Sequence, residues 1–163
     1  MSTRVPFDIE AYERLTRSSD CFICAILAGE ADNPHEVVWE DDRHFAFLNR
    51  YPTLPGYLLV SPKRHLVDVV RDLDTTDYLN LQAVVHRVAR AAATVLPTER
   101  VYLMSLGSMK GNAHIHWHVA CLPPGVPHER QQFHALMAEN GILDQTPAQR
   151  ADIAANLRFA LAE

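Results

Sequence analysis

Three histidines alternate with apolar residues in one short stretch, His114-Ile115-His116-Trp117-His118-Val119-Ala120. An alternation of period two is typical of a β-strand, whose successive side chains point to opposite faces of a sheet. We therefore expect the three imidazoles on one face and Ile115, Trp117 and Val119 on the other. Three weak bases on one face add little to packing, but they can bind a metal, bind phosphate or attack an electrophile. The stretch predicts a strand that carries chemistry.

Three interpretations of this histidine strand are open. Two imidazoles at positions i and i+2 could converge on a zinc ion, as in a hydrolase whose metal keeps an open fourth position. Alternatively, one neutral imidazole could attack phosphorus and leave again, which divides a displacement into two easier steps. Its neighbour would then donate a hydrogen bond to the phosphate or to the leaving oxygen. The third interpretation is three solvated histidines without a role, which the clean apolar face disfavours.

The other periodic segments predict an α+β fold. Besides His114–Leu122, strand patterns cover Glu36–Glu40, His44–Leu48, Tyr57–Ser61 and Val101–Leu106. One long helix is expected at about Asp77–Leu96, capped by Thr75 or Thr76. Its apolar stripe has the helical period and consists of Leu81, Val84, Val85, Val88, Ala92 and Val95. Because this helix separates strands three and four, we expect a mainly antiparallel five-stranded sheet with further helices near the two ends.

The chain divides into an expected central domain and two extensions. Residues 1–19 are charged and unpatterned, and we expect them to form an N-terminal extension with a short helical piece at Ile9–Leu15. Residues 20–124 contain all five predicted strands. Residues 125–163 are expected to form a C-terminal helical extension packed on the same domain. In this extension, Thr146-Pro147-Ala148-Gln149 is a capping box with proline at the first helical position, and the helix after it would bury Ile153, Leu157 and Leu161.

Composition limits the compartment and the partners. A net charge of −5 argues against a protein that coats a nucleic-acid polymer. The apolar stretches are shorter than the ~20 residues of a membrane span, and no secretory signal is evident. Three cysteines, an odd number, suit a reducing compartment better than a disulfide scaffold. We therefore expect a cytoplasmic protein without a membrane or nucleic-acid partner, in which Cys121 is a buried thiol on the face of Ile115 and Val119.

Four motifs together resemble one known family. The stretch from His114 to Ala120 resembles at every position the signature of the histidine triad (HIT) family, His-φ-His-φ-His-φ-φ, in which φ is apolar. Three earlier segments are similar to that family and stand in the same order. The first is Cys21-Phe22-Ile23-Cys24-Ala25-Ile26, and the second is the acidic turn, strand and loop of Glu40–Pro52. The third is the strand Pro55–His65, which ends in Pro-Lys-x-His. On these motifs the chain is identified as a HIT family member of the zinc-containing type over about residues 20–124. The resemblance also implies a homodimer whose two sheets join edge to edge.

The resemblance assigns roles in nucleotide chemistry to individual residues. His116 aligns with the nucleophile that takes up the nucleoside-phosphoryl group, and His118 aligns with the residue that hydrogen-bonds the phosphate and helps the leaving group. His114 aligns with a histidine that supports the nucleophile or ligates zinc. Asn49 stands where a residue binds the ribose hydroxyls. The other positions implied to contact substrate are Phe22 and Ile23 around the base, Ser105 near the α-phosphate, and Asn112 in the loop before the triad.

His118 bears on the branch of the family. Nucleotidyltransferases typically carry glutamine at this position, so histidine favours hydrolase or phosphorylase chemistry. We expect a nucleotide hydrolase that attacks the α-phosphate of a nucleoside polyphosphate or dinucleoside polyphosphate through a covalent nucleotidyl-histidine. The alternatives are a dinucleoside polyphosphate phosphorylase and a nucleotide-binding regulatory module with vestigial hydrolysis. Tyr57 departs from the family pattern, in which histidine commonly follows the glycine of this strand, and the departure bears on substrate preference more than on core chemistry.

Cys21 and Cys24 have the spacing of half a zinc site, but any further ligands lie far along the chain. Spacing alone leaves zinc, idle reduced thiols and a redox dithiol open, and the last requires a low-pKa cysteine at the start of a helix. The family resemblance implies that His65 and His114 complete the ligand set. A closed Cys₂His₂ sphere would make zinc structural rather than catalytic. The remaining histidines are expected at the surface or on helix faces, and they are His35, His44, His86, His128 and His134.

Overall fold

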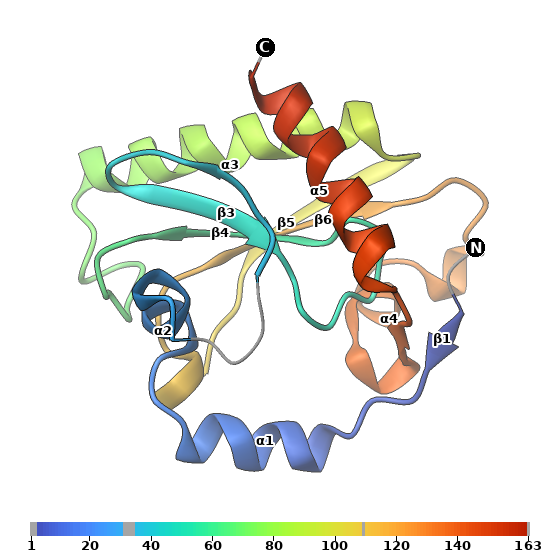
Figure 1. Cartoon of the computed structure of the whole chain (residues 1–163), viewed down its shortest axis with the longest axis horizontal. Coiled ribbons are helices and arrows are strands. Elements are labelled where there is room, and N and C mark those ends of the chain that lie inside the picture. Colours follow the sequence, from blue (N-terminus) through green and yellow to red (C-terminus); the bar gives the residue numbers. More distant parts are fainter. Residues whose placement is uncertain (1–2, 31–34, 109, 163) are drawn as a thin grey trace.

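A five-stranded antiparallel sheet forms the centre of the protein, in a computed structural model that describes residues 3–30, 35–108 and 110–162. The spatial order is β2-β3-β4-β6-β5. In that order the strands span Val37–Glu40, His44–Leu48, Leu58–Pro62, Trp117–Leu122 and Arg100–Ser105. Helix α3, Thr75–Val95, connects β4 to β5 and lies along one side of the sheet (Figure 1). The expected α+β fold, with one long helix between the third and fourth strands of the main sheet, is confirmed.

The face of the sheet that packs on α3, which we call the α3 face, holds the larger core. Leu58, Val60 and Val119 are fully buried there. The predicted stripe of α3 faces this core, although its last member, Val95, is only partly buried. The cap prediction was wrong, because Thr75 and Thr76 already belong to the helix. Asp74 is the cap: its side chain accepts a hydrogen bond from the Asp77 amide at 2.8 Å, and its charge is favourable at a helix N-terminus.

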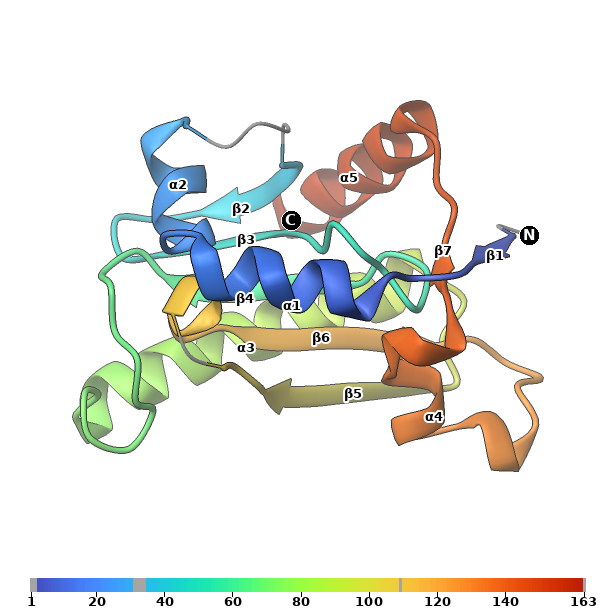
Figure 2. The same ribbon diagram turned by 90° about the horizontal axis from the view of Figure 1, so that it is seen from below.

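The opposite face, which we call the histidine face, holds a second core with Tyr57, Leu59, Ala120 and Leu122. Helix α2, Phe22–Ala28, and helix α4, Phe133–Leu136, pack against it. Helix α1, Ile9–Ser18, lies on the same side and crosses in front of the strands from β1, Arg4–Val5, toward α2 (Figure 2). The α1 and α3 helices therefore cover opposite sides of the sheet.

The histidine strand alternates as predicted but begins later. Ile115 and Val119 belong to the α3-face core, with Trp117 packed against it, whereas Ala120 belongs to the histidine-face core. The regular ladder starts at Trp117 rather than at His114, because the last pair with β4 is Val60 with Trp117. Before that point, the Ile115 amide donates to the Leu66 carbonyl at 2.7 Å, beyond the end of β4.

A second, two-stranded sheet joins the two extensions, which the sequence did not predict. Strand β1, Arg4–Val5, pairs antiparallel with β7, Ile142–Leu143. The Arg4 guanidinium donates to the carbonyls of Gly141 and Thr53, both at 2.7 Å. The Leu143 amide donates to the Pro52 carbonyl, also at 2.7 Å. We call this arrangement of β1, β7 and Arg4 the terminal clasp. It attaches both extensions to the loop between β3 and β4.

The C-terminal extension is mostly helical. Short 3-10 helices at His128–Arg130 (η2) and Ala138–Asn140 (η3) flank α4, and α5 spans Pro147–Ala162. Both bonds of the predicted capping box form, since the Thr146 amide donates to Gln149 at 2.9 Å and the Gln149 amide donates to the Thr146 hydroxyl at 3.2 Å. Leu157 and Leu161 are buried in the α3-face core as expected, whereas Ile153 is only partly buried against it. In the part of the chain that the structure describes, no helix combines the length and apolarity needed to cross a membrane.

Candidate functional site

The hydrogen bonds of His116 fix which of its ring nitrogens carries the proton. Nδ1 lies 2.7 Å from the backbone carbonyl oxygen of His114. A carbonyl can only accept, so Nδ1 is the protonated nitrogen and Nε2 holds the lone pair. Among the described residues, Nε2 has no hydrogen-bond partner. Burial lowers the pKa of His116, which keeps the ring neutral at pH 7 and leaves a free imidazole lone pair beside the sheet.

His114 connects this imidazole to two other segments. Its Nε2 donates to the carbonyl of Pro62 at the end of β4, at 2.8 Å. Its Nδ1, left without a proton, faces the Cys21 Sγ at 3.4 Å. The residue is completely buried. His114 therefore orients His116 with its backbone carbonyl and offers a ligand nitrogen with its ring.

His118 lies next to His116, with 4.9 Å between the ring centroids. Its Nδ1 is 3.1 Å from the hydroxyl of Tyr57, and its Nε2 is 3.4 Å from the Leu106 carbonyl. Burial, reinforced by the nearby His116, lowers the pKa of His118 to about 4. Sequence reasoning did not place Tyr57 in the site. The available signal was its departure from the histidine that is common at this position.

Four predicted metal ligands come together in the structure. Cys21 and Cys24 flank the first turn of α2, His65 follows β4, and His114 precedes β6. Their ligand atoms all lie within 4.8 Å of one another. Two sulfurs and two imidazole nitrogens are a donor set that suits tetrahedral zinc. The His114 proton is on Nε2, so the nitrogen that faces the sulfurs is free to coordinate, and the residues fit such an ion.

The Cys24 thiol is not of the low-pKa kind found in reactive redox cysteines. Burial, together with a hydrogen bond to Cys21, raises the pKa of the Cys24 thiol to about 11. A reactive dithiol requires the opposite shift, toward a stable thiolate. A metal ion would supply the missing positive charge, because coordination displaces the thiol proton.

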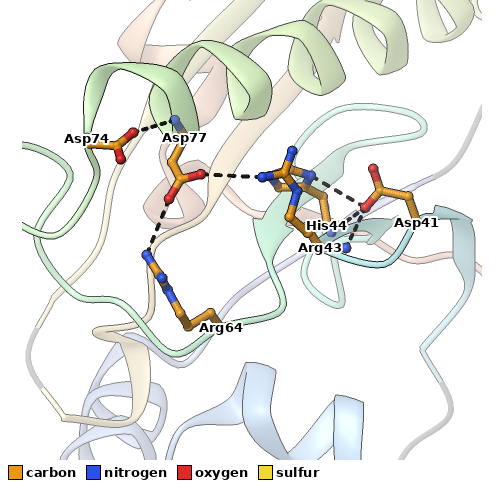
Figure 3. A network of polar contacts seen from close by, with 6 residues as sticks. All are labelled: Asp41, Arg43, His44, Arg64, Asp74 and Asp77. Atoms are coloured by element: carbon orange, nitrogen blue, oxygen red, sulfur yellow. Dashed lines mark hydrogen bonds and ion pairs between the residues drawn. The ribbon is translucent and has the colours of Figure 1, made fainter.

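Ion pairs hold the segment that carries His65 against the rest of the fold. Asp77, in the first turn of α3, contacts Arg64 and Arg43, each at 3.5 Å (Figure 3). Arg43 belongs to the turn between β2 and β3, where Asp41 accepts hydrogen bonds from the amides of Arg43 and His44. Exposed pairs of this length contribute little energy individually. Together they connect three segments beside the metal ligands.

Two of the predicted substrate residues, Phe22 and Ser105, contact His116. The Phe22 ring packs edge-on against the His116 ring, with centroids 5.7 Å apart. Ile23 is completely buried behind it. The Ser105 hydroxyl donates to the backbone carbonyl of His116 at 3.1 Å, so this hydroxyl supports the nucleophile strand. Asn112 is half-buried in the 3-10 helix η1, Lys110–Asn112, in the loop before the triad.

Asn49 lies at the end of β3 and is fixed on several sides. Its amide donates to the Tyr57 carbonyl at 2.8 Å, and its side-chain oxygen accepts from the Tyr51 amide at 2.9 Å. Its carbonyl accepts from the Arg150 guanidinium at 3.0 Å. The side-chain amide nitrogen has no hydrogen-bond partner within the described ranges, so it can donate to a ligand.

One histidine outside the triad differs from its prediction. His44 was expected at the surface but is buried, because it begins β3 and pairs with Pro62 of β4. Its Nδ1 lies 3.5 Å from Asp41 and makes no hydrogen bond within the described residues. His86, His128 and His134 are exposed as expected, and His35 is half-buried. Cys121 is buried, as predicted.

Comparisons with known proteins find similar sequences and folds. The model of the HIT domain matches residues 30–123. An uncharacterized HIT-like protein of Mycobacterium tuberculosis is 37% identical over 105 residues, which are 64% of this chain and 71% of that protein. A zinc-bound histidine triad family protein from Mycobacterium smegmatis is 28% identical, with a TM-score of 0.69 over 91% of this chain and 96% of that one. A HIT family hydrolase from Legionella pneumophila is 30% identical, with a TM-score of 0.50, and the match covers 62% of this chain and 91% of that one.

Proposed function

The chain belongs to the HIT domain family, and we propose that it hydrolyses nucleotides at the α-phosphorus through a covalent nucleotidyl-histidine. The observation that carries this proposal is the bond from His116 Nδ1 to the His114 carbonyl, because it leaves Nε2 as a nucleophile. The similar Legionella protein described as a HIT family hydrolase supports a hydrolytic role. The substrate class is a nucleoside polyphosphate or a dinucleoside polyphosphate.

The first step forms one bond and breaks another at phosphorus. His116 Nε2 attacks the α-phosphorus, and the bond from phosphorus to the leaving phosphate oxygen breaks with its electron pair on that oxygen. The ring gains positive charge while Nδ1 keeps its proton. The His114 carbonyl, 2.7 Å away, stabilises this charge. Water then attacks phosphorus and loses a proton to the solvent, the P–N bond breaks with its electrons returned to Nε2, and the nucleotide leaves.

The surrounding residues would bind the rest of the nucleotide. The half-buried ring of Phe22 beside His116 would offer an apolar surface for the base, and the buried Ile23, in the core against which Phe22 packs, would support it. Asn49 would donate its side-chain amide to the ribose hydroxyls. His118 would hydrogen-bond the phosphate, and Ser105 and Asn112 would contact the substrate from the strand and the loop before the triad. A cytoplasmic homodimer remains our proposal for the assembly and location.

Zinc would be structural in this site. Cys21, Cys24, His65 and His114 would hold the ion, and four protein ligands leave no open position for water. The similar zinc-bound protein from Mycobacterium smegmatis supports this assignment. Among the described residues, the metal-competent cluster includes neither His116 nor His118. This grouping argues against the alternative in which the triad itself ligates a catalytic metal.

The nucleophile is tested by replacing His116 with alanine. His116→Ala should lower kcat by about 10⁴–10⁶-fold on a panel of dinucleoside polyphosphates and nucleoside phosphoramidates, while nucleotide binding persists in calorimetry. Wild type, quenched during turnover, should carry an acid-labile nucleotidyl adduct by intact-mass spectrometry. His86→Ala is the matched control, because His86 is exposed on α3, and it should keep wild-type activity.

Other results would replace the proposal. Retention of more than about a tenth of kcat in His116→Ala would exclude this nucleophile. Products that incorporate inorganic phosphate when it is added would identify a phosphorylase. Tight nucleotide binding without turnover across the panel would indicate a regulatory nucleotide-binding module.

A further inference from the structure

We propose that Tyr57 is a positioning residue that holds His118 in the tautomer with its proton on Nε2. The Tyr57 hydroxyl lies 3.1 Å from His118 Nδ1, within hydrogen-bond distance. The two rings meet edge-on, with centroids 5.7 Å apart and an interplanar angle of 88°. Tyr57 itself is only 5% exposed, so bulk water does not compete for the bond.

The second contact of His118 determines the direction of this hydrogen bond. Nε2 faces the Leu106 carbonyl at 3.4 Å. A carbonyl cannot donate, and a neutral imidazole has a single N–H. With the proton on Nε2, Nδ1 must accept, and the Tyr57 hydroxyl is its donor. Burial raises the pKa of Tyr57 to about 12, which keeps the phenol protonated and able to donate.

The register of the sheet explains why the tyrosine reaches this histidine. Leu58 pairs with Val119 and Leu59 pairs with His118. Continuing that register places Tyr57 opposite Ala120 on the histidine face, where both residues belong to the same core. The small alanine leaves room for the ring to lean toward His118. The Tyr57 carbonyl also accepts from the Asn49 amide at 2.8 Å, so one residue contacts both the phosphate and the ribose sides of the proposed site.

The tautomer matters for the proposed hydrolysis, on which this part of the inference rests. With the proton on Nε2, His118 can exchange its long contact with Leu106 for a hydrogen bond to a phosphate oxygen. The other tautomer would present a lone pair to an anionic oxygen, which is repulsive. Tyr57 therefore acts through His118 and touches neither the phosphate nor the base.

The tautomer is measured by NMR spectroscopy, and the activity is measured separately by kinetics. Two-bond ¹H–¹⁵N correlation spectra of histidine-labelled, substrate-free protein at pH 7 report which nitrogen carries the proton, and His118→Gln assigns the signals. Wild type should show protonated Nε2, and Tyr57→Phe should show a mixture of tautomers or the reverse one. In Tyr57→Phe, kcat should fall about tenfold, the equivalent of one neutral hydrogen bond, and KM should change less than about twofold.

Tyr102→Phe is the matched control. It also removes a tyrosine hydroxyl that makes one hydrogen bond, here accepted from the Gln132 amide at 3.0 Å, and it should keep the wild-type tautomer and kcat. Three results would overturn the proposal: protonated Nδ1 in wild type, an unchanged tautomer in Tyr57→Phe, or an unchanged kcat in that variant. If Tyr57→Phe does not fold, the wild-type spectrum alone still tests which nitrogen of His118 carries the proton. Full activity in His116→Ala would overturn the nucleophile proposal instead and leave the tautomer assignment standing.

Discussion

Each histidine of the triad has a different partner, and the partner determines what the ring can do. His114 donates to Pro62, His116 donates to the His114 carbonyl, and His118 faces Tyr57. Burial lowers the pKa of all three rings. A nucleophilic imidazole must be neutral, and a neutral ring can donate a hydrogen bond without bringing a positive charge into the site. The same burial makes the native state sensitive to acid.

We predict that His118 contributes to acid sensitivity in a defined pH window. Its folded pKa of about 4 lies below the unfolded value near 6.5, so the unfolded chain binds the proton first as the pH falls. The contribution of His118 to stability is fully present above about pH 6.5 and is lost progressively as the pH falls to about 4. When the pH falls from 7 to 5, the unfolding free energy of wild type should decrease by roughly 2 kcal/mol more than that of His118→Gln.

Urea unfolding of both proteins at the two pH values measures this difference. His86→Gln is the control, because His86 is exposed on α3 and its replacement should leave the pH dependence unchanged. An identical loss in wild type and His118→Gln would mean that His118 is protonated equally in the folded and unfolded chains.

At the scale of elements, the terminal clasp supports the loop between β3 and β4. This loop carries Asn49 and receives hydrogen bonds from Arg4, Leu143 and Arg150, which belong to both extensions. Tyr51 of the loop also packs against Phe7, with ring centroids 4.9 Å apart. The extensions thus hold the residue that we propose binds the ribose.

Removing the guanidinium of Arg4 should loosen this loop. Arg4→Met loses two hydrogen bonds and should lower the unfolding free energy by about 1–2 kcal/mol. It should also raise KM for nucleotides more than it lowers kcat, because the triad is held by other contacts. Chemical denaturation and steady-state kinetics measure the two effects. Arg71→Met, which loses an exposed ion pair with Asp68, should resemble wild type. An unchanged KM in Arg4→Met would show that the clasp does not affect the site.

The sequence predicted the elements whose patterns repeat several times. Helix α3 and the main strands each show several periods, and the box at Thr146 has a specific local chemistry. The terminal clasp could not be predicted, since a two-residue strand such as β1 contains no period. The cap of α3 was assigned one or two positions too late because Asp74, Thr75 and Thr76 are all good caps in sequence. The contact of Tyr57 with His118 depends on the register between β4 and β6, which local patterns do not specify.

For the whole molecule, the metal ligands connect segments that are far apart along the chain. Cys24 and His65 are 41 positions apart and meet at 3.3 Å, and Cys21 and His114 are 93 positions apart. An ion that these residues bind only in the folded chain would add its binding free energy to the free energy of folding. The ion would therefore act on α2, the segment after β4 and the start of the triad together.

We predict about one zinc per chain and a structural effect when it is removed. Cys21→Ser and mild chelation should lower the melting temperature first, and activity should then decline slowly as the His114 end of the strand loosens. Metal analysis, thermal unfolding and an activity time course measure these quantities. Cys121→Ala, which replaces the buried thiol outside the ligand set, should keep the metal. Immediate loss of activity at an unchanged melting temperature would indicate a catalytic ion, and metal-free protein from chelator-free purification would indicate idle thiols.

The terminal clasp also sets an order of assembly during synthesis. Arg4 leaves the ribosome early, whereas its partner Gly141 is 137 positions later in the chain. All five strands of the main sheet are complete by Leu122, so the sheet can close while β1 still has no partner. Contacts that form after the main barrier slow unfolding more than they speed folding. We therefore expect the clasp to fix the ribose side of the proposed site only after the main sheet has closed.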